Sequence, residues 1–185
     1  MFRFFNSRDS PEVTSAPNPD HAWKTLALVN EWIRHADAKA GVTLAFTAAL
    51  ATMVFNLSKD FHQRTTIFDF LVAFASVLLV LTAALCGWTL TPRVNDRDAD
   101  PESINRLYFG SITQHFRGKR PQYSEVLSTL TADPSELIQD LAAQIHANAK
   151  IATIKARSAK WAIRSALATA ATVAVLAITV GVSIS

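Results

Sequence analysis

Long apolar runs, separated by charged stretches, organise this sequence. Residues 70–90 (FLVAFASVLLVLTAALCGWTL) carry no charge, and Trp88 lies near one end, where interfacial aromatic residues are enriched. A helix of about 20 apolar residues spans the hydrocarbon core of a bilayer. This run therefore predicts a transmembrane helix.

Two further runs are weaker candidates for spans. Residues 165–184 are long enough but consist mainly of Ala, Thr and Val, and Ala177 and Gly181 form a small pair that permits close helix packing. Residues 41–57 are seventeen long and include Asn56. Because this length is at the lower limit for spanning, a buried core helix stays open as the alternative for 41–57.

The charged stretch NEWIRHADAKAG continues into the first apolar run without a helix breaker. One helix that begins near residues 19–21 and enters the bilayer near Gly41 explains this pattern. Arg34 and Asp37 are three residues apart and can pair, while Lys39 can extend to the headgroups. Apolar residues at three- and four-residue spacing predict a packing face on this helix: Leu26, Val29, Ile33, Ala36 and Ala40.

A second long helix is predicted from the sequence DPSE. Asp133 fits the N-cap, Pro134 the first helical position and Glu136 the third. Nothing breaks the pattern before Gly181, so residues 135–184 can form one helix of about 75 Å. Lys160, Trp161 and Arg164 mark its membrane boundary. We expect the two long helices to form a cytoplasmic stalk that completes its core by oligomerisation.

The residues between the second and third spans have mixed character. NDRDADPE predicts a linker, ESINRLYFGSI a short extended or irregular element, and YSEVLSTL a short helix. Lys and Arg are concentrated before Gly41 and between Thr91 and Arg164, which places the N-terminus and this central region in the cytoplasm.

The predicted fold class is an all-α membrane protein with about three transmembrane helices and long helices that extend into a cytoplasmic helical domain. The predicted organisation is a flexible, unprocessed leader (1–20), a cytoplasmic helix (21–40), transmembrane helix 1 (41–57), transmembrane helix 2 (67–90), a cytoplasmic ligand-sensing region (91–161) and transmembrane helix 3 (162–184).

Composition argues against an enzyme. Half of the 185 residues are hydrophobic and the net charge is only +3. The sequence has no phosphate-binding glycine loop, HExxH or CxxC motif, and its single cysteine, Cys86, lies in an apolar run that would not stabilise a thiolate. We expect no catalytic residue, no metal site and no cofactor.

Residues 150–164 contain five basic and no acidic residues. This charge is explained by the inner membrane interface, by anionic lipid or by phosphate recognition, in which Arg157 would bind in a bidentate manner.

Tyr108 and Phe109 have two interpretations as well. They fit a packed core, or a platform on which a nucleobase stacks beside Asn105 and Arg106.

Four sequence segments together resemble the Pycsar transmembrane effectors, small bacterial membrane proteins of antiphage defence. The segments are WIRHADAKA at 32–40, the apolar hairpin that follows, NRLYFGSI at 105–112, and LAAQIHANAKIATIKARSAKW at 141–161. Together they cover most of the chain from Ala22 onward. The basic RGKRPQ after the second motif departs from the pattern and puts the ligand contacts there in doubt.

The resemblance implies a function. In that family a partner cyclase makes cyclic CMP or cyclic UMP in response to phage, and the effector binds the nucleotide and damages the bacterial inner membrane, which arrests growth. For this chain we expect a pocket between the stalks of a homo-oligomer, with Arg157 and Lys155 on the cyclic phosphate, Tyr108 stacked on the base and Asn105 at the base edge. The complete set of expected ligand-binding residues is Asp37, Lys39, Asn105, Arg106, Tyr108, Lys155 and Arg157.

Other functions stay open at this point. A constitutive membrane scaffold, whose cytoplasmic helices bind a protein partner without any small ligand, fits the same topology. For Asp37 a structural ion pair with Arg34 or Lys39 is an equal alternative to ligand binding. Nucleic acid is not an expected partner, because the basic residues lie at the membrane surface.

Overall fold

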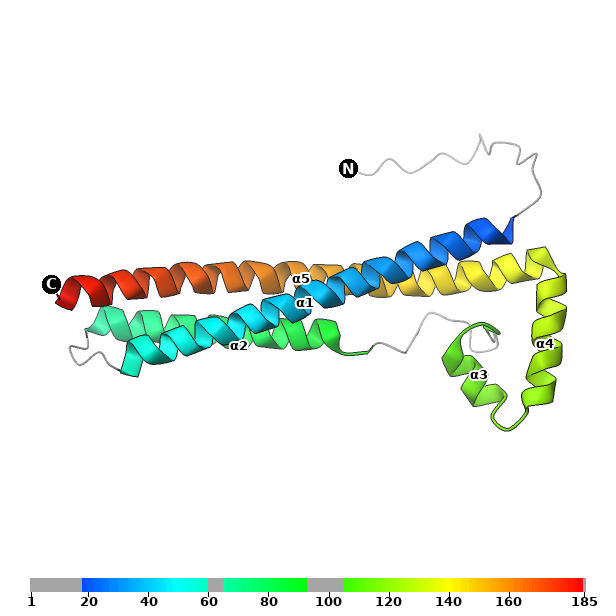
Figure 1. Cartoon of the computed structure of the whole chain (residues 1–185), viewed down its shortest axis with the longest axis horizontal. Coiled ribbons are helices and arrows are strands. Elements are labelled where there is room, and N and C mark those ends of the chain that lie inside the picture. Colours follow the sequence, from blue (N-terminus) through cyan, green and yellow to red (C-terminus); the bar gives the residue numbers. More distant parts are fainter. Residues whose placement is uncertain (1–17, 60–64, 93–104, 185) are drawn as a thin grey trace, which may run out of the picture.

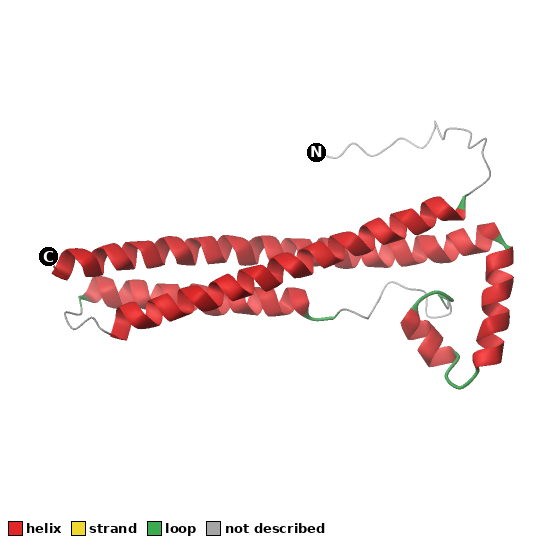
Figure 2. Cartoon of the chain, viewed as in Figure 1, coloured by secondary structure: helices red, strands yellow, loops and turns green. Residues whose placement is uncertain are grey.

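The computed structural model describes residues 18–59, 65–92 and 105–184, and these residues form five α-helices (Figure 2). The helices are α1 (Pro19–Lys59), α2 (Thr66–Leu90), α3 (Phe109–His115), α4 (Arg120–Ala132) and α5 (Pro134–Ile184). The predicted all-α class is confirmed. Most of the expected leader and the whole NDRDADPE linker lie outside the described residues.

The three long helices α1, α2 and α5 lie side by side and form an elongated bundle (Figure 1). Two side-chain bonds join α1 to α5, Asn30 to Asn148 and Asp37 to Lys155, and each joins residues 118 positions apart. A constant offset means that α1 and α5 run in the same direction with one register. The intervening α2 returns antiparallel to both.

The contact between α1 and α5 follows a coiled-coil pattern. The buried residues of α1 follow one another at alternating spacings of three and four residues, and half-buried Ile33 fills the gap between Val29 and Ala36. The buried residues are Leu26, Val29, Ala36, Ala40, Thr43, Thr47, Leu50 and Val54. The same alternation continues on α5 through Ala152, Lys155, Ala159, Ala162, Ala166, Thr169, Val173 and Leu176. A 3-4 repeat keeps two helices in continuous contact. The predicted packing face is therefore confirmed, and the pairing passes from the charged part into the apolar part without a shift in register.

Three helices of the described chain are long and apolar enough to cross a membrane, namely α1, α2 and Pro134–Val182 of α5. Their outward faces carry large exposed apolar side chains, among them Phe46, Phe55, Phe70, Phe74 and Ile178. Such faces match the hydrocarbon of a bilayer. The predicted three-span membrane fold agrees with this arrangement. Below, the term stalk means residues 19–40 and 134–161, which lie outside the predicted spans.

The free end of the stalk is held by a cap and a leucine cluster. Asp133 Oδ1 accepts hydrogen bonds from the backbone N–H of Ser135 at 2.8 Å and of Glu136 at 3.3 Å, which confirms the predicted N-cap of α5. Helix α4 meets α5 at this point (Figure 1). The cluster contains Leu26 of α1, Leu130 of α4, and Leu137 and Leu141 of α5.

Residues 102–104 of the segment ESINRLYFGSI lie outside the described residues, and the rest of the segment differs in part from its prediction. Residues 105–108 are irregular, as expected, but Phe109 begins the helix α3. The local reason is a hydrogen bond from Ile112 N to Tyr108 O at 3.0 Å, which closes a helical turn over Gly110. The short helix predicted at YSEVLSTL is confirmed as part of α4.

Candidate functional site

A buried ion pair joins α1 and α5 where the stalk meets the spans. Lys155 Nζ lies 2.6 Å from Asp37 Oδ1. The Lys155 side chain is 6% exposed and that of Asp37 is 34% exposed. Asp37 is thus in a structural ion pair, which was the alternative to ligand binding, but its partner is Lys155 and not Arg34 or Lys39. Arg34 Nη2 instead lies 3.4 Å from Glu31 Oε2.

The surroundings of this pair are built from small residues. Ala36 and Ala40 of α1 and Ala152 and Ala159 of α5 are buried next to it along the seam. Alanine lets the helices approach closely but leaves little apolar surface to stabilise the contact. A buried ammonium that lost its carboxylate would be strongly destabilising. The charge pair is thus the main specific contact at this level of the stalk.

A second polar contact lies one heptad further from the membrane. Asn148 Nδ2 donates to Asn30 Oδ1 at 2.8 Å, seven residues before Lys155 and Asp37 respectively. This pair is half-buried, and polar pairs along the seam of a coiled coil help to fix its register. Sequence reasoning missed both asparagines, although their equal spacing from Asp37 and Lys155 was a signal that could have identified them.

Lys39 and Arg157 lie at the same level but point away from the seam. Each follows a member of the ion pair by two residues, which is a rotation of about 200° around a helix. Both side chains are exposed. They are therefore open to a ligand or to a second chain, whereas Asp37 and Lys155 are already occupied by each other.

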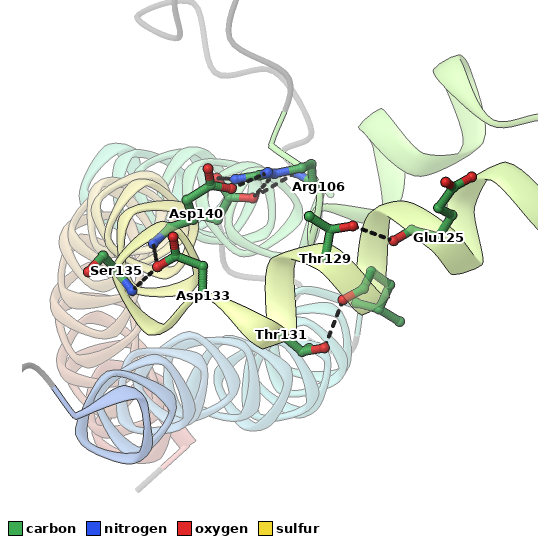
Figure 3. A network of polar contacts seen from close by, with 9 residues as sticks. Arg106, Glu125, Thr129, Thr131, Asp133, Ser135 and Asp140 are labelled. Carbon is green, nitrogen blue, oxygen red and sulfur yellow. Dashed lines mark hydrogen bonds and ion pairs between the residues drawn. The ribbon is translucent and has the colours of Figure 1, made fainter.

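Arg106 forms a clamp on the start of α5 (Figure 3). Its Nε donates to Asp140 Oδ2 at 2.9 Å and its Nη1 donates to Glu136 Oε2 at 2.8 Å, with further contacts from Nη2 and the backbone N–H to Asp140. These hydrogen bonds to two carboxylates raise the pKa of Arg106. The guanidinium therefore attaches residues 105–108 to α5, a role that the sequence did not indicate.

Asn105 and Tyr123 complete the attachment. Asn105 Nδ2 donates to the Asp140 carbonyl at 3.0 Å, and Asn105 Oδ1 accepts from the backbone N–H of Leu107 at 2.9 Å. Tyr123 Oη donates to the Arg106 carbonyl at 3.2 Å. One donor and one acceptor of the Asn105 amide are thus used within the chain, and the amide keeps a second N–H and a second lone pair that could contact a base edge.

Tyr108 packs against its neighbours at the start of α3. Its ring centroid lies 4.8 Å from that of Phe109, which is itself 65% exposed. Burial raises the pKa of the Tyr108 hydroxyl. A Cβ added at Gly110 would lie 2.5 Å from Tyr108 Cε1, so the ring position requires glycine there.

An open hollow of about 470 Å³ lies at the C-terminal end of α3. It is lined by Ile112, Thr113, Gln114, Phe116 and Arg117. Sequence reasoning did not select these residues as a site, although Arg117 is the first residue of the basic RGKRPQ segment.

Within one chain the seven predicted ligand residues form two separate groups. Asp140, which holds Asn105 and Arg106, precedes Lys155 by fifteen residues, or about 22 Å along α5. Asp37, Lys39, Lys155 and Arg157 lie at one level near the spans, whereas Asn105, Arg106 and Tyr108 lie near the free end of the stalk. One chain does not bring them together.

No group of three or more His, Cys, Asp or Glu residues that could hold a metal ion occurs in the described ranges 18–59, 65–92 and 105–184. The chemistry of the described site is thus ion pairing, amide hydrogen bonding and aromatic packing.

Two comparisons with known proteins agree with each other. A family described as the Pycsar effector protein domain matches residues 21–182. The chain is also 35% identical, over 158 residues, to the Pycsar effector protein PtPycTM of Propioniciclava tarda, and the match covers 85% of this chain and 75% of the relative. No solved structure matches the chain. The family match includes all three long helices and the whole candidate site, and the chain belongs to the Pycsar effector protein family.

Proposed function

We propose that this effector binds a cyclic pyrimidine nucleotide, cyclic CMP or cyclic UMP, outside its membrane spans and then impairs the integrity of the bacterial inner membrane. The result is growth arrest or cell death during phage infection. The effector acts by binding and conformational change, without catalysis, and a partner cyclase supplies the nucleotide. Family membership supports the antiphage role, and the polar junction between α1 and α5 supports the mechanism.

The observation that carries this mechanism is the continuity of two helices. Helices α1 and α5 run unbroken from the stalk into the spans, in one register, and the Asp37–Lys155 pair lies at the junction. A ligand shifts a conformational equilibrium only if it binds one state better than the other. A nucleotide that binds one arrangement of the stalk better would therefore change the packing of the spans directly.

The nucleotide site lies between the stalks of two or more copies. Exposed Lys39 and Arg157 provide cations for the cyclic phosphate at the level of the ion pair, and Arg157 offers bidentate geometry. The stalk also exposes Trp23, Leu28 and Trp32, at 45%, 51% and 54%, which a second copy would cover. Copies that cross one membrane in the same direction lie parallel and at the same depth, so the Tyr108 group of a second chain stays near the free end of the stalk, about 22 Å from the level of Lys155 and Arg157.

The stalk lies in the cytoplasm. Residues 150–164 carry basic side chains and no acidic ones, and Arg164 packs over the Trp161 ring with its guanidinium carbon 5.0 Å from the ring centroid. A basic and aromatic boundary is typical of the inner interface. This orientation gives the stalk access to a nucleotide made inside the cell.

Calorimetry on the purified protein in detergent tests the proposal. We expect saturable binding of cyclic CMP or cyclic UMP, and no binding of cyclic AMP. If the well-folded protein binds neither cyclic CMP nor cyclic UMP, the proposal is contradicted and a membrane scaffold with a protein partner is favoured.

Two arginine variants locate the phosphate contact. Arg157→Ala removes the proposed phosphate ligand and should weaken nucleotide binding by about tenfold or more, because a charge-assisted hydrogen bond is worth roughly 1.5–3 kcal/mol. Arg34→Ala is the matched control, since it also removes an exposed arginine from the stalk. Equal affinity of both variants and the unchanged protein would show that Arg157 does not hold the phosphate.

A further inference from the structure

The buried residues of the three spans include many hydroxyl side chains on the stalk side of a common depth, beside Cys86, Ala162 and Ala166, and only apolar side chains beyond it. On the stalk side the core contains Thr43 and Thr47 of α1, Thr82 and Thr89 of α2, and Ser165, Thr169 and Thr172 of α5, and we call these residues the hydroxyl core. On the far side the core contains Leu50 and Val54 of α1, Phe68 and Ala75 of α2, and Val173 and Leu176 of α5. We call these six residues the apolar plug. The change occurs in each of three helices, although α2 runs opposite to the others.

The hydroxyl groups bond mainly to their own helices. Thr43, Thr47, Thr89, Thr169 and Thr172 each donate to the carbonyl four residues earlier, at 2.7–2.9 Å. A hydroxyl that donates its single proton in this way keeps acceptor lone pairs. The hydroxyl core therefore has oxygen acceptors to offer within the part of the bundle that a bilayer would surround.

One hydroxyl contact links two helices. Thr82 Oγ1 lies 2.8 Å from both Ser165 Oγ and the Leu78 carbonyl, and Ser165 Oγ donates to the same carbonyl at 3.2 Å. Thr82 has one proton and can satisfy one acceptor at a time. This part of the core thus has more than one hydrogen-bonding arrangement.

The apolar plug has the opposite character. Phe68 and Leu176 pack together and are 3% and 0% exposed, and Leu50, Val54, Ala75 and Val173 form the adjacent cluster. Water and ions do not cross a closely packed apolar constriction, and channels use such constrictions as gates that open by wetting. Polar residues that face the interior of a membrane bundle mark ion pathways in other membrane proteins.

We propose that the hydroxyl core is the stalk-side half of a path for small monovalent cations, and that the apolar plug keeps this path closed. The entrance lies just beyond the Asp37–Lys155 pair, whose two charges cancel, while the exposed Lys39 and Arg157 at the same level point away from the seam. Activation needs to separate the plug only, because the other half already carries oxygen ligands. The inference rests on the proposed impairment of the membrane and specifies how the membrane is impaired.

A plug variant tests the path without any nucleotide. The full-length protein is reconstituted into liposomes loaded with KCl, and potassium efflux is followed with a selective electrode. Leu176→Ser should raise ligand-free efflux by about tenfold, a factor that corresponds to a barrier lower by about 1.4 kcal/mol. Ile178→Ser is the matched control, since Ile178 lies on the same helix but is 65% exposed. Equal efflux through both variants would overturn the proposal.

Hydroxyl variants test the other half of the path. Adding Thr82→Val and Thr169→Val to Leu176→Ser removes acceptors at two fully buried positions and keeps side-chain shape, and should return efflux to the unchanged level. The control is Thr52→Val, an exposed threonine within a span, which should leave the efflux high. Persistent efflux after the first pair of substitutions would overturn the proposal.

Two further results make the test decisive. A large entrapped dye such as calcein should stay inside, and its release at the rate of potassium would show gross disruption instead of a narrow path. If Leu176→Ser does not insert, Leu176→Ala opens the plug with a smaller change. Because these measurements use no nucleotide, failure of the path and failure of nucleotide binding are separate outcomes.

Discussion

Lys155 of α5 is bound to Asp37 of α1 across 2.6 Å, at the point where the two parallel helices enter their spans. The pair lies between alanines and is followed, further into the bundle, by Thr43 and Thr47. The leucine cluster at the free end of the stalk and the apolar plug at the far end provide apolar packing on either side. The middle of the molecule is therefore held mainly by polar contacts, which a ligand can exchange more readily than it can undo a leucine core.

Removal of the carboxylate at this position should destabilise the folded protein. Asp37→Ala leaves the Lys155 ammonium buried without its partner, and we expect the free energy of unfolding to fall by about 2 kcal/mol. This is less than the cost of breaking a fully buried pair, because the Asp37 side chain is one-third exposed. The free energy of unfolding can be measured by titrating the protein in mixed micelles with SDS.

Two controls separate the ion pair from general damage. Lys39→Ala changes an exposed charge two residues away and should alter stability by less than about 0.5 kcal/mol. The double substitution Asp37→Leu with Lys155→Met replaces both charges with apolar groups and should recover most of the loss. A double variant that is as unstable as Asp37→Ala would show that packing, and not the unpaired ammonium, determines the cost.

The asparagine pair should show an energetic coupling. Asn30→Ala and Asn148→Ala each remove one side of the 2.8 Å hydrogen bond. In a double-mutant cycle we expect a coupling of about 1 kcal/mol, the usual net value of a hydrogen bond between neutral groups. Strictly additive losses would mean that the two amides do not support each other, and that the register of α1 and α5 depends on Asp37 and Lys155 alone.

The fold could be predicted from the sequence because its signals are local. Asp133 and Pro134 specify the start of α5, uncharged runs specify the spans, and the 3-4 spacing from Leu26 to Ala40 specifies the packing face. Each of these depends on residues within a few turns of a helix. The same local reasoning explains why Phe109–His115 was missed as a helix, since Gly110 and two aromatics do not favour one.

The candidate site could not be predicted as well, because its contacts join distant residues. Asp37 has basic neighbours on its own helix, yet its partner is 118 residues away. Arg106 has the chemistry of a phosphate ligand, but Asp140 and Glu136 occupy it after folding. Sequence shows which groups a residue can bind, while the packing of α5 decides which of them it meets.

The Arg106 clamp should depend on the shape of the guanidinium as well as its charge. Arg106→Lys keeps the charge but cannot bind Asp140 and Glu136 with a planar fork. We expect faster hydrogen exchange of the backbone amides at residues 105–116, and a stability loss of about 1–2 kcal/mol. Arg117→Lys, at an exposed arginine beyond α3, should change neither quantity. Unchanged exchange in Arg106→Lys would show that the leucine cluster holds this segment without the clamp.

The Tyr108 hydroxyl should ionise above the ordinary tyrosine pKa of 10.0, because burial disfavours the phenolate. Tyr108 and Tyr123 are the two tyrosines of the chain, so Tyr123→Phe leaves one phenol to follow by the ultraviolet absorbance of tyrosinate. The folded state holds this proton more tightly than the unfolded state. The resulting stabilisation is complete below pH 10 and is lost as the pH rises through the folded-state pKa.

Substitution of the neighbouring glycine should reverse this shift. Gly110→Ala places a methyl group against the Tyr108 ring, which must then move toward water, and the ionisation midpoint should fall back toward 10.0. Gly41→Ala is the control, because a Cβ at Gly41 meets nothing within 4 Å. If the midpoint stays high in Gly110→Ala, the ring has moved to another buried position, and the base-stacking role proposed for Tyr108 loses its structural support. A midpoint that falls would instead show that no other buried position accepts the ring, so that the packed position of Tyr108 depends on the absence of a side chain at Gly110.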